Sequence, residues 1–149
     1  MTLVRNGAVV ADAWSDATYF TPESWAAARE SGQAAKGPRA LTLGPDDAVE
    51  SPGPDAACFD LIAIAFPSFT DGRPYTAARL LRERYAYTGE LRATGQVLRD
   101  QLFFMVRCGF DTFEVADAEA FAQAMHEISV VYQPAADGRT GALWHRRAA

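Results

Sequence analysis

The chain has 149 residues, of which 49% are hydrophobic, and a formal net charge of −5. This length and apolar content suit one globular domain with one core, and no apolar run approaches the roughly 18 residues of a membrane span. An acidic chain without a basic stripe among exposed aromatic residues also argues against nucleic-acid binding.

The first third of the chain predicts a hairpin, a helix and a short strand. Asn6-Gly7 is a hairpin turn signal between short apolar segments. Thr21-Pro22 marks the start of a helix that runs to about Glu30, and 40–43 is a strand candidate. Residues 44–56 form a polar connection with proline turns, which we expect to be flexible. The N-terminus lacks the basic-then-apolar order of a signal peptide, so we expect a cytoplasmic protein.

Strands and helices then alternate. The pattern predicts strands at 61–66, 91–94 and 111–115 and helices at 74–86 and 97–107. Short loops between them imply right-handed crossovers and a mainly parallel sheet. We therefore predict a single α/β domain over residues 1–149, with an open or half-barrel-like sheet and a small N-terminal β-hairpin. A homodimer could cover an exposed flank of such a sheet.

Helical spacing assigns faces to these helices. Arg79, Arg82 and Arg84 are interpreted as a solvated face, and Leu98 and Leu102 as part of a packed stripe with Phe104 beside it. Asp117 is expected to cap a further helix with Phe121, Ala122 and Met125 toward the core. Residues 128–132 are a candidate last strand, and 134–149 are expected to be an irregular tail.

Cysteine and histidine content gives no metal site. Cys58 and Cys108 have no metal-like spacing, and His126 and His145 are too few for a three-ligand zinc site. Cys108 is expected to pack as a small hydrophobe, with a redox role as the alternative. There is no Walker loop, GxGxxG, GxSxG or HExxH motif, so no cofactor is assigned.

Polar side chains gather in the two loops that follow the 61–66 and 91–94 strands. At the carboxyl ends of parallel strands, such loops are where ligands bind. We hypothesise a small oxyanion or acidic metabolite held by Arg73, Arg92 and Arg99, with Asp71 or Asp100 as a proton carrier. The full set of candidate ligand-binding residues is Thr70, Asp71, Gly72, Arg73, Arg92, Gln96 and Arg99. The alternative is that Asp71 caps a helix and Arg99–Asp100 belongs to a structural ion-pair network.

Several segments together resemble a known bacterial family. They are Phe66-Pro67-Ser68-Phe69-Thr70-Asp71-Gly72-Arg73, Ala78-Arg79-Leu80-Leu81-Arg82-Glu83-Arg84-Tyr85, Gly89-Glu90-Leu91-Arg92-Ala93, Val97-Leu98-Arg99-Asp100-Gln101-Leu102 and Arg107-Cys108-Gly109-Phe110-Asp111. Together they resemble the bacterial domain of unknown function 934 family. Its members are described as oxidoreductases of sulfite reduction because they accompany assimilatory sulfite reductase. The resemblance implies a sulfur-assimilation context, with sulfite reductase as the expected partner, and it implies no catalytic residues.

Three functions stay open at this stage. The first is an accessory protein that docks to the sulfite reductase system through its apolar helix or its arginine-rich face. The second is a small oxidoreductase or oxyanion-binding subunit with a cleft between the Asp71–Arg73 and Gln96–Asp100 loops, which would need a borrowed or loosely held cofactor for redox chemistry. The third is a purely structural role. The small size and the lack of a cofactor motif favour the accessory function.

Overall fold

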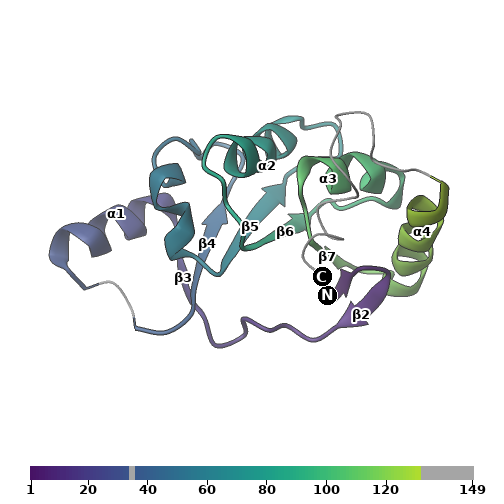
Figure 1. The fold of residues 1–149 in the computed structure, drawn as a ribbon, viewed down its shortest axis with the longest axis horizontal. Helices are drawn as coiled ribbons and strands as arrows, with labels where there is room; N and C mark the ends of the chain where they lie inside the picture. The colour runs from purple at the N-terminus through teal and green to yellow at the C-terminus, as the bar shows by residue number, and fades with distance from the viewer. Residues whose placement is uncertain (34–35, 132–149) are drawn as a thin grey trace.

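A computed structural model describes residues 1–33 and 36–131. In these residues a single sheet has the strand order β2-β1-β7-β6-β5-β4-β3 (Figure 1). The strands are β1 (Thr2–Arg5), β2 (Ala8–Val10), β3 (Thr18–Phe20), β4 (Arg39–Leu43), β5 (Leu61–Phe66), β6 (Glu90–Gly95) and β7 (Thr112–Val115). Strands β3 to β7 run parallel to one another, whereas β1 is antiparallel to both β2 and β7. The prediction of a mainly parallel α/β domain with an N-terminal hairpin is confirmed.

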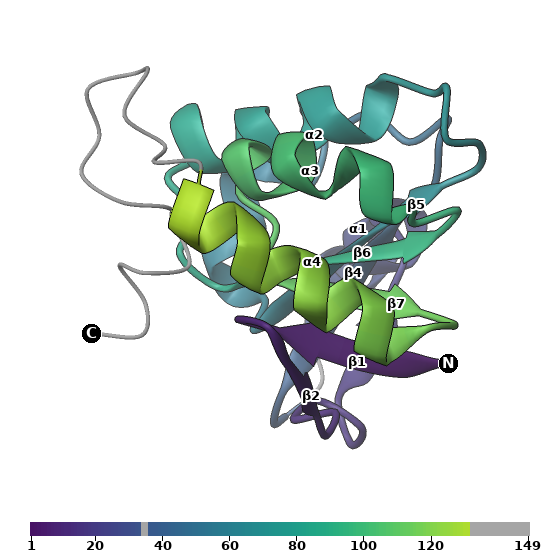
Figure 2. The same ribbon diagram turned by 90° about the vertical axis from the view of Figure 1, so that its right-hand side faces the viewer.

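All the helices pack on one face of this sheet. They are α1 (Pro22–Ser31), α2 (Arg73–Glu83), α3 (Leu102–Cys108) and α4 (Ala118–Val131), with 3-10 helices η1 (Gly53–Cys58) and η2 (Arg99–Gln101). From β3 to β7 each connection leads to the adjacent strand, and right-handed crossovers in one direction keep the connections on one side. Figures 1 and 2 show α2, α3 and α4 on that side, and the β2–β3 connection running along the other side. Within residues 1–33 and 36–131 the sheet is therefore open, and its helices cover one face only.

The elements begin and end where local sequence chemistry requires. Asn6 and Gly7 have φ angles of 51° and 77°, the left-handed pair that a two-residue hairpin turn requires. Thr21 accepts a hydrogen bond from the Ser24 backbone N–H at 3.2 Å and caps α1. Gly32, with a φ of 67°, ends that helix. The predicted hairpin and the predicted start of α1 are confirmed.

The core lies between the helices and one face of the sheet. Strand residues that point toward the helices are large and apolar, and the helices present matching side chains. The largest of these fully buried residues are Leu41, Leu43, Leu61, Ile62, Ile64, Phe66, Leu81, Leu91, Leu102, Met105, Phe110 and Phe113. Only Leu61 points to the opposite face, because it pairs with Ala40 and Glu90. Phe121 and Met125 of α4 are also buried, as predicted.

Two sequence predictions about elements are wrong, and one strand was missed. The helix predicted from 97 begins at Leu102, because Leu98 is extended (φ −108°, ψ 140°) and η2 intervenes. The segment predicted as a last strand is helical up to Val131, where its apolar residues continue the helical pattern of α4; Tyr132 and the predicted tail lie outside the described residues. Strand β3 was not predicted, because three residues carry too little periodicity.

Two face assignments are also wrong. Arg82 is not on a solvated face: its side chain is 4% exposed and forms an ion pair with Asp111. Arg79 is exposed, as predicted, with a side chain 62% accessible. Leu98 and Phe104 are 39% and 61% exposed, whereas Leu102 is fully buried. A helix that starts at Leu102 turns Phe104 away from the core, and Leu98 precedes the helix altogether.

The polar connection over residues 44–56 contains ordered, buried positions. Val49, Gly53 and Ala56 are buried, and η1 begins within the segment. Asp55 accepts a hydrogen bond from the Trp25 indole N–H at 2.9 Å and pairs with Arg29. The expected flexibility of this segment stays a prediction. Within the described residues, no helix is long and apolar enough to cross a membrane.

Candidate functional site

The face of the sheet that the helices leave uncovered, here called the open face, carries small and polar side chains. Alternation along β5 sends Ile62, Ile64 and Phe66 into the core and Ala63 and Ala65 to the open face. Parallel sheets are ordinarily covered on both faces and apolar on both. The composition of this open face therefore differs from that of a sheet face that packs against helices.

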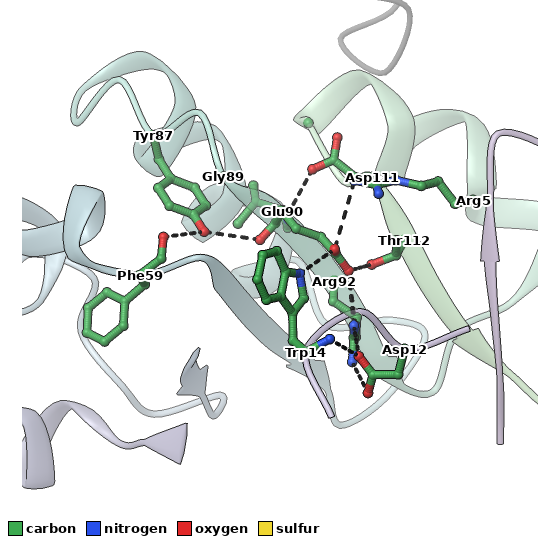
Figure 3. Close-up of polar contacts among 12 residues, drawn as sticks. Arg5, Asp12, Trp14, Phe59, Tyr87, Gly89, Glu90, Arg92, Asp111 and Thr112 are labelled. Atoms are coloured by element: carbon green, nitrogen blue, oxygen red, sulfur yellow. Dashed lines mark hydrogen bonds and ion pairs between the residues drawn. The ribbon is translucent and has the colours of Figure 1, made fainter. Parts of the chain in front are cut away.

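A buried ion network occupies the middle of the open face (Figure 3). The Arg92 and Glu90 side chains, both on β6, are each 5% exposed and lie 3.1 Å apart from Nη2 to Oε1. Asp12 accepts hydrogen bonds from both terminal nitrogens of Arg92, at 2.9 and 3.2 Å. The Glu90 carboxylate also accepts hydrogen bonds from the Thr112 hydroxyl at 2.7 Å and from the Trp14 indole N–H at 2.8 Å. One guanidinium is thus held between two carboxylates.

The pKa values of this network follow its geometry. The hydrogen bond from Arg92 lowers the pKa of the Asp12 carboxyl, despite an opposing effect of burial. Burial alone would lower the pKa of Arg92, but the hydrogen bonds and charges of Asp12 and Glu90 raise it overall. Asp12 and Arg92 are therefore both charged at neutral pH, and neither has a pKa suited to proton transfer there.

Residues 11–17, here called the crossing segment, connect β2 to β3 and are held against the open face by Asp12 and Trp14.

A hollow of about 560 Å³, here called the C-terminal hollow, lies at the carboxyl ends of the parallel strands. It is lined by Tyr19, Thr21, Thr42, Leu43, Gly44, Asp47, Ala63, Ala65, Arg92, Thr94 and Glu114. A second hollow of about 400 Å³ lies toward the opposite strand ends and is lined in part by Trp14, Tyr87 and Glu90.

The first predicted loop forms its own cluster of charges. Arg73 Nη2 lies 2.6 Å from Asp71 Oδ2, and Arg73 Nη1 lies 2.9 Å from Asp46 Oδ1. Asp71 also accepts a hydrogen bond from the Arg73 backbone N–H at 2.9 Å, while the N-cap position of α2 itself is Gly72. The hydrogen bonds from Arg73 lower the pKa of Asp71, which makes this carboxylate a weak base at neutral pH.

The neighbouring residues of that loop add a hydroxyl pair and a glycine. Thr70 and Ser68 hydroxyl oxygens lie 2.9 Å apart, and both residues are close to the surface. Gly72 precedes α2 with an ordinary φ of −85°, so the turn itself does not require glycine. Asp46 of this cluster adjoins Asp47, which lines the C-terminal hollow.

The second predicted loop lacks the expected helix N-terminus. Gly95 has a φ of 83°, and its backbone lies so close to the Phe66 carbonyl that a β-carbon would clash there. Gln96 follows, exposed, with its backbone N–H donating to that same carbonyl at 2.8 Å. Arg99 and Asp100 are exposed in η2 and not in the first turn of α3. The free backbone N–H groups at the start of α3 therefore lie beyond this loop.

The three arginines of the predicted oxyanion site thus have different surroundings. Arg92 is in the ion network and lines the C-terminal hollow, Arg73 pairs with Asp71 and Asp46, and Arg99 is exposed. Arg92 and Thr94 share one face of β6. Oxyanion binding by these residues stays a prediction.

Sequence reasoning missed several residues around Arg92. Glu90 was placed before the strand, although the alternation Glu90-Leu91-Arg92 would put both charges on one face of β6. Asp12 and Trp14 lie in a connection without periodicity, and nothing local links them to β6. Glu114 alternates with apolar neighbours on β7, which was the one available signal for it.

No metal or thiol chemistry is assembled in the part of the chain that the structure describes. Within it, no group of three or more His, Cys, Asp or Glu side chains could hold a metal ion. Cys108 is half-buried, and burial raises the pKa of its thiol, which opposes thiolate formation. Cys58 is exposed at the end of η1.

Exposed apolar side chains gather around one polar residue at the carboxyl ends of β5 and β6. Phe69, Leu98 and Phe104 are 51%, 39% and 61% exposed, and we call them the apolar patch. Gln101 links them: its side chain donates to the Phe69 carbonyl at 2.6 Å, and its backbone N–H donates to the Leu98 carbonyl at 3.1 Å. Phe104 lies three residues further along, on the same helical side. Tyr75 donates to Gln101 at 3.0 Å and holds it in place.

A protein-family model matches most of the chain. A family model described as "Bacterial protein of unknown function (DUF934)" matches residues 40–143. A search of curated proteins finds no match. The matched range includes β4 to β7 and the apolar patch, whereas β1 to β3 and the crossing segment precede it.

Proposed function

The chain belongs to the bacterial DUF934 family of unknown function, and we propose that it is an accessory protein of assimilatory sulfite reduction in the cytoplasm. In this proposal the protein performs no chemistry itself and docks to the sulfite reductase system. The partner is taken from the sequence resemblance described above. The mode of action is taken from the apolar patch.

The apolar patch carries the docking proposal. Exposed aromatic side chains grouped on a rigid base are the usual anchors of protein interfaces, and isolated exposed apolar residues are not. Gln101 supplies the base, because it ties the loop after β5 to the start of α3 through Phe69 and Leu98. The patch therefore keeps its shape without a partner, which reduces the entropy lost on docking.

Arginines surround the apolar patch. Arg99 follows Leu98 directly, and Arg107 lies one helical turn beyond Phe104 with its guanidinium 5.3 Å from the centre of the Phe103 ring. Arginine beside aromatic residues is the composition enriched in interface centres. This arrangement combines the apolar helix and the arginine-rich face that the sequence suggested as alternatives.

The test is direct binding to purified sulfite reductase, measured by biolayer interferometry. Phe104→Ala should weaken binding by about 30-fold or more, the effect of losing an interface anchor worth about 2 kcal/mol. Val9→Ala is the matched control, because Val9 is 55% exposed but lies on β2, away from the patch. Absence of binding by the unmodified protein, or equal loss with both variants, would contradict the proposal.

A second candidate function is supported by the cluster at the end of β5. Arg73 is 58% exposed there, beside Asp71, and could present its guanidinium to a small oxyanion such as sulfite. In that case the protein is an oxyanion-binding subunit or a small oxidoreductase. Arg73→Ala and Arg99→Ala should then lose sulfite binding in calorimetry while they keep the fold. Unchanged sulfite affinity in both variants would remove this candidate.

A homodimer is a further part of the proposal. The uncovered open face is the observation that supports it, since parallel sheets are ordinarily covered on both sides. The mass in solution should then be near twice 16.2 kDa by light scattering. A mass near 16.2 kDa at high concentration would reject the dimer and leave the docking proposal intact.

A further inference from the structure

The C-terminal hollow is a second functional surface, separate from the apolar patch. Its lining comes from β3 to β7 on the open face, whereas the patch lies in the loops after β5 and β6 and on α3. The carboxyl ends of parallel strands are the ordinary ligand position in α/β sheets. A volume of about 560 Å³ is in the range of small-molecule sites.

Small residues on β5 create this space. Ala63 and Ala65 form the floor, while the same strand sends Ile62, Ile64 and Phe66 to the core. A strand with large side chains on one face and small side chains on the other leaves space on the second face, where a helix or larger side chains would otherwise pack. The neighbouring Thr42 and Thr94 are also compact, so the hollow extends across β4, β5 and β6.

Hydrogen-bond acceptors dominate the lining. The Thr42 hydroxyl donates to the Phe20 carbonyl at 3.3 Å, and the Thr94 hydroxyl donates to the Ile64 carbonyl at 3.5 Å. A hydroxyl whose single proton is donated to the backbone can only accept hydrogen bonds from a ligand, through its lone pairs. Glu114 adds a carboxylate that makes no ion pair or side-chain hydrogen bond within residues 1–33 and 36–131.

Donors are scarce by comparison. The Arg92 guanidinium has five N–H donors, and four hydrogen bonds to Asp12 and Glu90 leave one of them, on Nη1. The Tyr19 hydroxyl is the other side-chain donor of the lining that has no protein acceptor among the residues the structure describes. The hollow therefore accepts more hydrogen bonds than it can donate.

The charge of the hollow is negative. Arg92 is the one cation among the described lining residues, and Asp12 and Glu90 offset its charge, although Glu90 also lies 3.9 Å from Arg5. Glu114 and Asp47 add carboxylates on opposite sides of the lining, from β7 and from the loop after β4. A sulfite ion would be repelled here, whereas a cation would be attracted.

We propose that the C-terminal hollow binds a small organic cation that carries a primary ammonium or guanidinium group. The N–H donors of such a group match the carboxylate of Glu114 and the lone pairs of Thr94, which lie side by side on the adjacent strands β7 and β6. The rest of the molecule lies on Ala63 and Ala65, beside Tyr19. This site is independent of the proposed docking function, since no residue of the apolar patch belongs to it.

Calorimetry on the full chain with ethanolamine, putrescine, agmatine and choline tests the proposal. Ethanolamine, putrescine or agmatine should bind with a measurable Kd. Choline has a positive charge but no N–H donor, so it should bind at least about tenfold more weakly than ethanolamine. Sodium sulfite should not bind at this site. Absence of binding by all three amines at 10-millimolar concentrations, on the order of the weakest specific affinities, would overturn the proposal.

Two variants locate the bound amine. Glu114→Gln keeps the shape and removes one charge, and it should weaken amine binding by about 10- to 100-fold, as expected for a lost charge-assisted hydrogen bond. Glu127→Gln on α4 makes the same charge change on the helical side of the molecule and should leave affinity unchanged. Ala65→Leu fills the floor without changing charge and should also abolish binding. Equal affinities across the variants would show that the amine binds elsewhere and would overturn the assignment.

The docking proposal and the amine-binding proposal can be tested independently of each other. Phe104→Ala should leave amine affinity unchanged, and Glu114→Gln should leave binding to sulfite reductase unchanged. Loss of both activities in one variant that retains its thermal transition would contradict the independence of the two surfaces.

Discussion

Arg82 Nη2 lies 2.8 Å from Asp111 Oδ2, and the two side chains are only 4% and 1% exposed. The same guanidinium donates to the backbone carbonyls of Tyr87, Gly89 and Gly109. It thereby joins α2, the connection to β6 and the end of α3. Asp111 in turn accepts a hydrogen bond from the Leu91 backbone N–H at 2.9 Å. The ion pair therefore also fixes the position of the first residues of β6.

Removal of either charge should be costly. Arg82→Met would leave the Asp111 carboxylate buried without its cation, and we expect the free energy of unfolding to fall by about 3–5 kcal/mol. Urea denaturation measures this. Arg79→Met is the control, because Arg79 is exposed on the same helix and its pair with Glu83, at 3.7 Å, should contribute less than about 1 kcal/mol. Similar decreases in the free energy of unfolding for the two variants would contradict a larger contribution from the buried Arg82–Asp111 ion pair.

The contact between Asp12 and Arg92 should make the crossing segment sensitive to acid. Because the pKa of Asp12 is lowered in the folded protein, its ionised form favours folding. That contribution is complete above the unfolded-state pKa of about 3.9 and is lost as the pH falls through the lower folded-state pKa. Asp12→Asn should therefore destabilise the protein at pH 7 and have a much smaller effect once the pH is below the lowered folded-state pKa of Asp12.

Thermal unfolding of Asp12→Asn and Asp16→Asn across this pH range checks the prediction. Asp16 lies in the same segment and is exposed, with no ion pair among the residues that the structure describes. Its substitution should have little effect at any pH. A loss of stability with Asp12→Asn that stays constant as the pH falls from 7 through the folded-state pKa of Asp12 would mean that the contact acts through packing and not through charge.

Gly95 should not accept a side chain. Its φ of 83° and the adjacent Phe66 carbonyl both oppose a β-carbon, so Gly95→Ala should lower the free energy of unfolding by about 1–3 kcal/mol. Gly72→Ala is the matched control, because Gly72 has a φ of −85° and open space around it. Gly72→Ala should leave the free energy of unfolding unchanged or raise it slightly. Denaturant titration of both variants would decide, and equal effects would contradict the strain argument.

Neighbouring residues of α3 should respond very differently to truncation. Leu102 is fully buried, and Leu102→Ala should cost about 2–5 kcal/mol. Phe104 is 61% exposed, so Phe104→Ala should cost less than about 1 kcal/mol. Chemical denaturation gives both values. A large loss for Phe104→Ala would place this ring in the core and remove the apolar patch.

Local signals in the sequence predicted most of the elements. The Asn6-Gly7 turn, the Thr21 cap and the apolar run of β5 each depend on a few adjacent residues, and each was predicted correctly. The start of α3 was not, because Val97 and Leu98 fit a helical pattern as well as an extended one. Only the tertiary structure, where Gln96 bonds to the Phe66 carbonyl, selects the extended form.

The candidate site was less accessible to prediction. The strand ends that carry it were predicted, and Arg92 was among the predicted residues. The partners of Arg92 were not predicted, because Asp12 is 80 residues away and no local pattern relates them. The charge of a buried arginine can be judged only with its counterions, and Asp12 and Glu90 offset the charge of Arg92 in the fold.

The pairing of β1 with β7 has a consequence for folding. Thr2 is aligned with Val115 and Arg5 with Thr112, so the first strand joins the sheet through nearly the last one. Strands β3 to β7 can add to one another in the order of synthesis, each beside its predecessor. The N-terminal hairpin must instead wait until β7 has left the ribosome, and closing so long a loop slows the step. We therefore expect β1 and β2 to join the sheet last, and to be the first part of it to open to hydrogen exchange.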